Sequence, residues 1–450
     1  MTSEQAGIYL LVTINAAVLG YYFRAMPTFV LWLIPSTYFL MVIFLNYPLR
    51  ALVLLHLEPE SFKDGDILNA LAFTTAFTLI FVVTTILLVQ AYRYAPGAWI
   101  SRAGSPRRPN ATFRHVVIAV GVAILVGFAY RFYSGRILGL FESREDLLFS
   151  PWEVLLGASH SLIWFVFLSS LILYRETARF RYLVLFLVLT GAYLLETVLA
   201  TAKGPILYLL ILYVIYKSYF EMRINVRLVL GIGLLGLVYA AYTYLARYFG
   251  DVRSGFSLVG VTDTITGVIE NIEHWSEIGV QGTISRFSYL DGLILLMNKG
   301  AWLDQGYFSL GTVTELINLI PRFLYPDRPE INFNVYLSGE VWDSGSVAEN
   351  PIGRIGEAFF VFRYAGVVIA PIYASIMFFA YRLLLCSASP WKQGVYFSMF
   401  FIYLLPDAYF FYNVKPMLHG LIILLLARLM VPGFVDALRF YRLSDSKLVD

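Results

Sequence analysis

The sequence has little charge and almost no cysteine. Of its 450 residues, 14% are charged and 59% are hydrophobic, whereas a soluble domain usually has about 25% charged residues. A water-soluble globular protein is therefore excluded. The single cysteine, Cys386, excludes an internal disulfide and any metal site built from several thiolates. The net charge of +3 is scattered along the chain, which argues against a nucleic-acid surface, because such a surface needs clustered positive charge.

Long apolar runs take the place of the missing charge. A helix needs about 20 mostly apolar residues to cross the hydrocarbon core of a bilayer. The sequence contains about eleven such runs and therefore predicts an all-α polytopic membrane protein. A further half-crossing segment at 47–57 is an open alternative. The runs cover roughly residues 7–23, 28–46, 69–92, 116–133, 153–174, 182–200, 204–221, 228–247, 366–386, 394–411 and 416–432.

Lysine and arginine predict the side of the membrane on which each connection lies. Basic residues cluster in segments 93–115, 175–181 and 217–227 and in the C-terminal tail. In this count of spans, all four segments fall on one side, and the positive-inside rule makes that side the cytoplasm. The N-terminus then lies outside and the C-terminus inside. Most of the charged residues in the outside connection 47–68 are acidic, in agreement with this orientation.

The predicted spans divide the chain unevenly. Residues 1–247 hold the spans before one long outside segment, residues 248–365 form that segment, and residues 366–450 hold the last three spans and a cytoplasmic tail. The long segment contains many aromatic residues with Gly and Pro between them, which predicts a folded segment. Stretches 263–278 and 283–299 have the pattern of short helices.

Arginines of the long outside segment are candidates for binding an anion. A guanidinium matches phosphate oxygens bidentately and keeps its charge. Several converging arginines would therefore clamp a lipid-linked pyrophosphate at the outer membrane surface. The alternative is an ordinary solvated surface. The candidates are Arg247 at the entrance of the segment and Arg253, Arg286, Arg322, Arg328 and Arg354 within it.

Two local patterns add to this expectation. Three prolines between residues 321 and 329 fix the backbone that carries Arg322 and Arg328. The run Lys203-Gly204-Pro205 separates two apolar segments. Such a break leaves backbone N–H groups free at a helix N-terminus, which is a ready anion site. A tight hairpin with Lys203 reaching toward the interface is the alternative interpretation.

A family resemblance rests on two motifs of the long segment. They read Pro-Arg-Phe-Leu-Tyr-Pro-Asp-Arg-Pro at 321–329 and Pro-x-Gly-Arg-x-Gly-Glu-Ala-Phe at 351–359. With the layout of nearly the whole chain, they resemble the bacterial oligosaccharide repeat-unit polymerases, the Wzy-type O-antigen and enterobacterial common antigen polymerases. The chain departs from that family at Lys203, where the family often has arginine, and at 362–366, where an aromatic-Gly pair is usual.

The resemblance implies a metal-independent glycosyltransferase of the GT-C type in the bacterial inner membrane, with no cofactor. Such an enzyme transfers a growing glycan from undecaprenyl pyrophosphate to the terminal sugar of a new lipid-linked repeat unit at the periplasmic face. A chain-length regulator protein is an implied partner. We expect Lys203 and the arginines above to bind pyrophosphate or glycan. Glu357 is the first candidate for the base that deprotonates the acceptor hydroxyl, with Asp291 and His274 in reserve.

Other functions fit parts of the sequence. An O-antigen ligase would use the same chemistry with a different acceptor. A metal-dependent GT-C enzyme using a polyprenyl-phosphate sugar would carry paired acids in an outside loop, and Asp64-Gly65-Asp66 lies in such a loop, although paired acids are also typical of a solvated loop. A transporter of lipid-linked oligosaccharides would need polar residues along the span centres, and several of the predicted spans have few.

Overall fold

The computed structural model describes mainly helical parts of the chain. Within them no strand occurs, and five helices are long and apolar enough to cross a membrane, as expected of a multi-pass membrane protein. These helices are Ser3–Ala25, Pro35–His56, Asp64–Tyr92, Ala111–Arg131 and Arg363–Leu385. The described residues are 2–93, 110–133, 162–199, 211–217, 289–298, 353–387, 389–404 and 420–431, with the single residues 209, 231, 325 and 418. The other predicted spans and the predicted helix at 263–278 lie wholly or partly outside these ranges.

The N-terminal helices form a packed group. Helices α1 and α5 run in the same direction, because Gly7 lies against Leu68 and the Asn15 side chain donates a hydrogen bond of 2.7 Å to Thr75. The chain returns between them through α3, η1 and α4. The bounds are α1 (Ser3–Ala25), α2 (Thr28–Leu31), α3 (Pro35–Phe44), η1 (Leu45–Leu49), α4 (Arg50–His56) and α5 (Asp64–Arg93).

The returning helix is longer than the sequence predicts. Pro48 has no backbone N–H, and the helix passes it through the wider π-helical turn of η1 instead of ending. The helix therefore extends to His56, where the ring Nε2 lies 2.6 Å from the hydroxyl of Tyr9 in the first turns of α1. The predicted connection 47–68 is thus reduced to residues 57–63 between α4 and α5.

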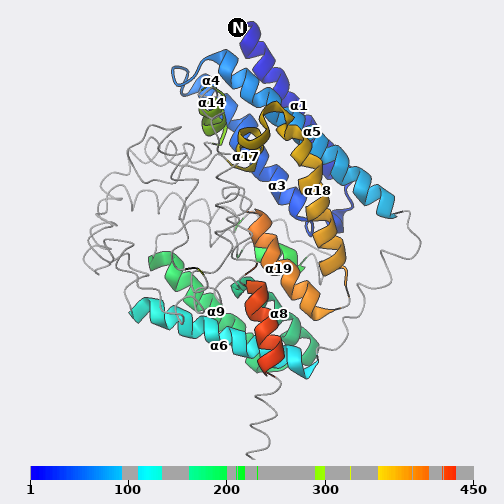
Figure 1. The fold of residues 1–450 in the computed structure, drawn as a ribbon, viewed down its shortest axis with the longest axis vertical. Helices are drawn as coiled ribbons and strands as arrows, with labels where there is room; N and C mark the ends of the chain where they lie inside the picture. The colour runs from blue at the N-terminus through cyan, green and yellow to red at the C-terminus, as the bar shows by residue number, and fades with distance from the viewer. Residues whose placement is uncertain are drawn as a thin grey trace, which may run out of the picture.

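A C-terminal group of helices packs along α5. It comprises α17 (Gly353–Phe362), η7 (Arg363–Val368), α18 (Ile369–Ala380) and η8 (Tyr381–Leu385). Three ring pairs fix a parallel alignment: Phe73–Phe359 at 5.3 Å, Phe77–Tyr373 at 6.4 Å and Tyr92–Phe378 at 5.2 Å between centroids. Because the alignment is parallel, α17 lies at the end of the bundle where α5 begins (Figure 1).

A second group of helices occupies the other end of the molecule in Figure 1. It contains α6 (Ala111–Tyr133), α8 (Ile163–Thr177), α9 (Phe180–Leu199), α19 (Pro390–Leu404) and the helix Gly420–Val431. Helices α8 and α19 approach closely at Gly394, where a Cβ atom would lie 2.5 Å from the Phe165 ring. The hydroxyl of Tyr396 donates to the backbone of Leu33, which ties this group to the N-terminal one.

Helix α14 (Tyr289–Asn298) comes from the long segment and packs on α5, α17 and η1. It confirms in part the helix that the sequence predicts at 283–299. Its apolar face is buried, since Leu290 and Ile294 are fully shielded from solvent. Figure 1 shows it beside α4 and close to α17. Segments that are far apart in the sequence therefore meet at this end of the bundle.

Candidate functional site

The structure describes three of the side chains that the sequence predicts to be functional. Arg354 and Glu357 lie on α17, and Asp291 lies on α14. Both helices lie at the end of the bundle where α1 and α5 begin (Figure 1). The other predicted residues lie outside the described ranges and stay predictions: Lys203, Arg247, Arg253, His274, Arg286, Arg322 and Arg328.

Asp291 is held by an arginine that sequence analysis did not select. Arg50, the first residue of α4, donates from Nε to Asp291 Oδ1 at 2.9 Å and from Nη2 to Oδ2 at 2.6 Å. The same guanidinium donates to both oxygens of Glu58, at 3.0 Å from Nη1 and 2.7 Å from Nη2. One planar cation thus binds two carboxylates in the forked geometry that favours arginine.

The Arg50–Asp291 pair is buried, whereas Glu58 reaches the surface. The side chains of Arg50 and Asp291 are 4% and 9% exposed, and that of Glu58 is 33% exposed. Burial raises the pKa of the Asp291 carboxyl, and the hydrogen bonds from Arg50 oppose that rise. The cluster thus contains one guanidinium and two carboxyl groups. Of the two carboxyl groups, Glu58 is the one that reaches the surface.

Arg354 and Glu357 meet at one tyrosine of α18. They are three positions apart and therefore share a face of α17. Arg354 is 2% exposed, and its guanidinium lies 5.7 Å from the ring centroid of Tyr373. The Tyr373 hydroxyl is hydrogen-bonded to the Glu357 side chain, which is only partly buried. The arrangement places a fixed cation and a reachable carboxylate side by side.

A tight junction connects this pair to the Arg50 cluster. Gly353, which begins α17, has a φ of +65°, a value that glycine adopts without strain. A Cβ atom there would lie 2.9 Å from the Tyr289 ring and 3.0 Å from the hydroxyl of Tyr47. Tyr289 is two residues before Asp291, and Tyr47 is three residues before Arg50. Helices α14, η1 and α17 therefore pack together at Gly353.

The paired acids that would suit a metal-dependent enzyme lie at the same end. Asp64 and Asp66 form the first turn of α5, and the Asn298 side chain donates a hydrogen bond of 3.1 Å to Asp66. Among the described residues, no group of three or more His, Cys, Asp or Glu side chains could hold a metal ion. Acidic residues in the first turn are also ordinary at a helix start, because they lie near the positive end of the helix dipole.

Sequence analysis missed Arg50, Glu58 and Tyr373. The predicted span ended at residue 46, so Arg50 was assigned to the connection 47–68. The apolar run 51–55, which directly follows Arg50, indicates instead that the residue lies in an apolar helix. A charged residue inside an apolar helix is a functional candidate by default. Tyr373 carried no such signal, because tyrosine is frequent in this chain and a hydroxyl partner depends on packing.

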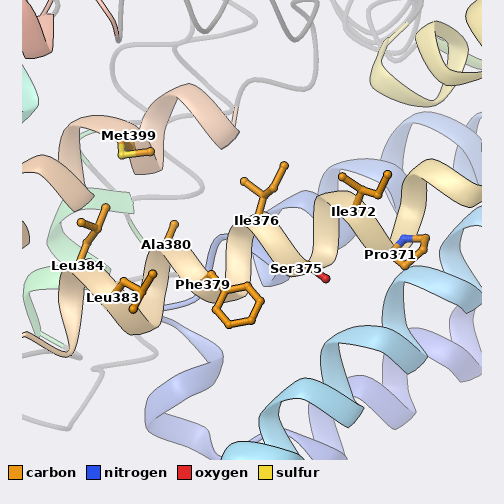
Figure 2. A pocket seen from close by; sticks show the side chains of 9 residues that line it. All are labelled: Pro371, Ile372, Ser375, Ile376, Phe379, Ala380, Leu383, Leu384 and Met399. Carbon is orange, nitrogen blue, oxygen red and sulfur yellow. The ribbon is translucent and has the colours of Figure 1, made fainter.

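An apolar groove runs along the face of α18 next to the one that carries Tyr373. It has a volume of about 630 Å³ and is lined by residues of α18 and η8, with Met399 added from α19. Figure 2 shows these side chains following the helix from Pro371 to Leu384, with Ser375 as the polar exception. Ile372 and Leu383 are half or more exposed. A hydrocarbon chain is the kind of ligand that such a lining accepts.

A second ion pair joins α6 to α9. Arg131 Nη1 lies 2.7 Å from Glu196 Oε1, and the two side chains are 27% and 18% exposed. The Arg131 guanidinium also lies 5.1 Å from the ring centroid of Phe128. Together with the contact between Gly121 and Leu185, the pair shows that α6 and α9 run in the same direction, as the predicted order of spans requires.

No protein-family model, curated protein or solved structure matches this chain. The interpretation of the site therefore rests on its geometry and on the two motifs of the long segment. One of these motifs, at 351–359, contains both Arg354 and Glu357.

Proposed function

We propose that this protein is an inner-membrane polysaccharide polymerase. It would transfer a growing glycan from undecaprenyl pyrophosphate to the terminal sugar of a new lipid-linked repeat unit at the periplasmic face, without a metal ion. The proposed architecture has about eleven transmembrane helices in a GT-C-like arrangement, with the N-terminus in the periplasm and the C-terminus in the cytoplasm. A chain-length regulator is the proposed protein partner.

The observation that carries the proposal is the pairing of Arg354 and Glu357 at Tyr373. Both residues belong to the motif on which the family resemblance rests, and both lie at one end of an apolar bundle. Charged side chains in such a bundle are costly and are typical of a functional site. A leaving pyrophosphate needs a cation that keeps its charge, and an acceptor hydroxyl needs a carboxylate that substrate can reach.

The geometry also ranks the candidate bases. Both oxygens of Asp291 accept hydrogen bonds from Arg50, and the side chain is almost fully buried. Glu357 is only partly buried, and one of its hydrogen-bonding partners is the hydroxyl of Tyr373. Glu357 therefore stays the first candidate base. In the proposal, Arg354 acts with Lys203 and the arginines of the long segment in binding pyrophosphate or glycan.

The groove on α18 supports a hydrocarbon-linked substrate. Tyr373 lies between Ile372 and Ser375 of the groove, on the same helix. A polyprenyl tail seated along the groove would extend away from the turn of α18 that carries Tyr373 and toward Leu384 (Figure 2). In this arrangement the tail and the charged headgroup would occupy neighbouring faces of one helix.

The test is the surface polysaccharide of a deletion strain complemented with variants and separated on a gel. We expect the wild-type chain to restore the long ladder, whereas Glu357→Gln leaves mainly single repeat units, because removing a general base costs about 100-fold or more in rate. Glu176→Gln, at an exposed carboxylate near the end of α8, is the matched control and should restore the ladder. A full ladder with Glu357→Gln contradicts the base assignment.

The same assay separates the proposal from its rivals. A ladder of normal length that stays on its lipid carrier identifies a ligase. Loss of polymerisation in isolated membranes on addition of EDTA identifies the metal-dependent transferase, for which Asp64 and Asp66 are the candidate ligands. A deletion strain with unchanged polysaccharide contradicts the polymerase and the ligase, and it favours the transporter and the metal-dependent transferase instead.

A further inference from the structure

We infer that Arg50 is a positioning residue, which anchors α14 through Asp291 and thereby sets the position at which α17 presents Arg354 and Glu357. The inference rests on the proposed function where it concerns activity. Its structural part, the anchoring of α14, stands on the contacts alone.

The first step is the bond between distant segments. Arg50 and Asp291 are 241 positions apart and make two hydrogen bonds of 2.9 and 2.6 Å. Glu58, eight positions from Arg50, accepts two further hydrogen bonds from the guanidinium and restricts the orientation of its plane. Because one rigid fork serves both carboxylates, a shift of α14 relative to α4 would break the geometry of the whole cluster.

The second step leads from α14 to α17. Tyr289 of α14 and Tyr47 of η1 pack against Gly353 so closely that no side chain fits there. Their rings lie 6.3 Å apart. Arg354 is the next residue after Gly353, and Glu357 follows within one helical turn. The place of both side chains at Tyr373 therefore depends on where α14 and η1 stand.

The third step concerns what a buried ion pair contributes. Charge burial costs desolvation energy, so replacing such a pair by apolar side chains of similar volume is often neutral for stability. The two hydrogen bonds of the Arg50–Asp291 pair, in contrast, are directional and are both made in the arrangement of α4 and α14 seen here. The Arg50–Asp291 bond selects the particular position of α14 that also fits Gly353.

The experiment compares two double variants, and each of them replaces both members of an ion pair with apolar side chains. Arg50→Met/Asp291→Leu removes the anchor, and Arg131→Met/Glu196→Leu removes the second ion pair and serves as the matched control. Both are placed in a Cys386→Ser background that also carries Leu293→Cys on the buried face of α14. Polymer length is measured on gels, and thiol exposure is measured with a membrane-impermeant maleimide.

We expect the anchor variant to accumulate in the membrane, to lose polymer by about 100-fold and to expose the Leu293→Cys thiol. The control variant should keep both polymer and thiol protection. A parallel series with Ile8→Cys, on the buried face of α1, should stay protected in both variants. If the anchor variant does not accumulate, Arg50→Lys, which keeps the charge and loses the fork, takes its place with the same expectations.

Several outcomes overturn the inference. Full polymer in the anchor variant means that the pair is only a packing element. Lost polymer with a protected Leu293→Cys thiol means that Asp291 acts chemically and is not a partner in positioning. Labelling at both Leu293→Cys and Ile8→Cys means general loosening. If the wild-type chain itself makes no polymer, the proposed function fails, and the labelling alone decides whether Arg50 anchors α14.

Discussion

Among the described residues, the Arg131–Glu196 and Arg50–Asp291 ion pairs differ in what they join. Arg131 and Glu196 connect two helices, α6 and α9, that are close in the sequence, and both side chains keep some contact with solvent. Arg50 and Asp291 connect the N-terminal helices to a helix of the long segment 241 positions away, and both are buried. The first pair reinforces a contact between two helices, whereas the second bonds a helix of the long segment to the N-terminal group beside the candidate site.

Loss of one partner from the buried pair should have the largest effect on stability. Arg50→Met leaves Asp291 buried without its cation, and we expect a loss of about 3–5 kcal/mol in the free energy of unfolding. Arg50→Met/Asp291→Leu should recover most of that loss, because no uncompensated charge remains inside. Thermal unfolding in detergent measures both. Equal midpoints for the single and double variants would show that volume, and not charge, sets the effect.

Two glycine-to-alanine variants compare how tightly the two ends of the molecule are packed, at Gly353 and at Gly191. Gly353→Ala brings a Cβ atom against Tyr289 at a positive φ, and we expect a cost of about 1–3 kcal/mol. Gly191→Ala in α9 meets nothing within 4 Å and should be neutral or stabilising by up to about 1 kcal/mol, since alanine favours a helix. Unfolding midpoints of the two variants should shift in opposite directions or differ clearly in size.

Loss of one partner from the half-buried Arg131–Glu196 pair should have the smallest effect on stability. Arg131→Met leaves Glu196 with access to solvent, and we expect a loss of only about 1 kcal/mol. The loss should depend more on salt than that of Arg50→Met does, because salt screens a partly exposed pair more than a buried one. Unfolding midpoints at low and high salt measure this. A loss as large as that of Arg50→Met, independent of salt, would mean that burial does not distinguish the two pairs.

Much of the secondary structure follows from the local sequence. Apolar runs identified each of the five long helices, and the pattern at 283–299 located α14 to within a few residues. The helix through 47–56 was suggested only as an alternative half-crossing segment at 47–57; it continues α3 because a π-helical turn accommodates Pro48. The motif at 351–359 pointed to Arg354 and Glu357, but their common partner Tyr373 could not be predicted, because side-chain partners between helices depend on alignment.

The sequence by itself determined that the described chain is helical and apolar enough for a membrane, because helix formation and transfer into lipid depend on short stretches of residues. The tertiary structure decided which charges meet. Nothing local links Arg50 to Asp291, or Gly353 to Tyr47 and Tyr289. Those contacts exist because the parallel packing of α1, α5 and the α17–α18 segment brings their ends together, and packing is a property of the whole fold.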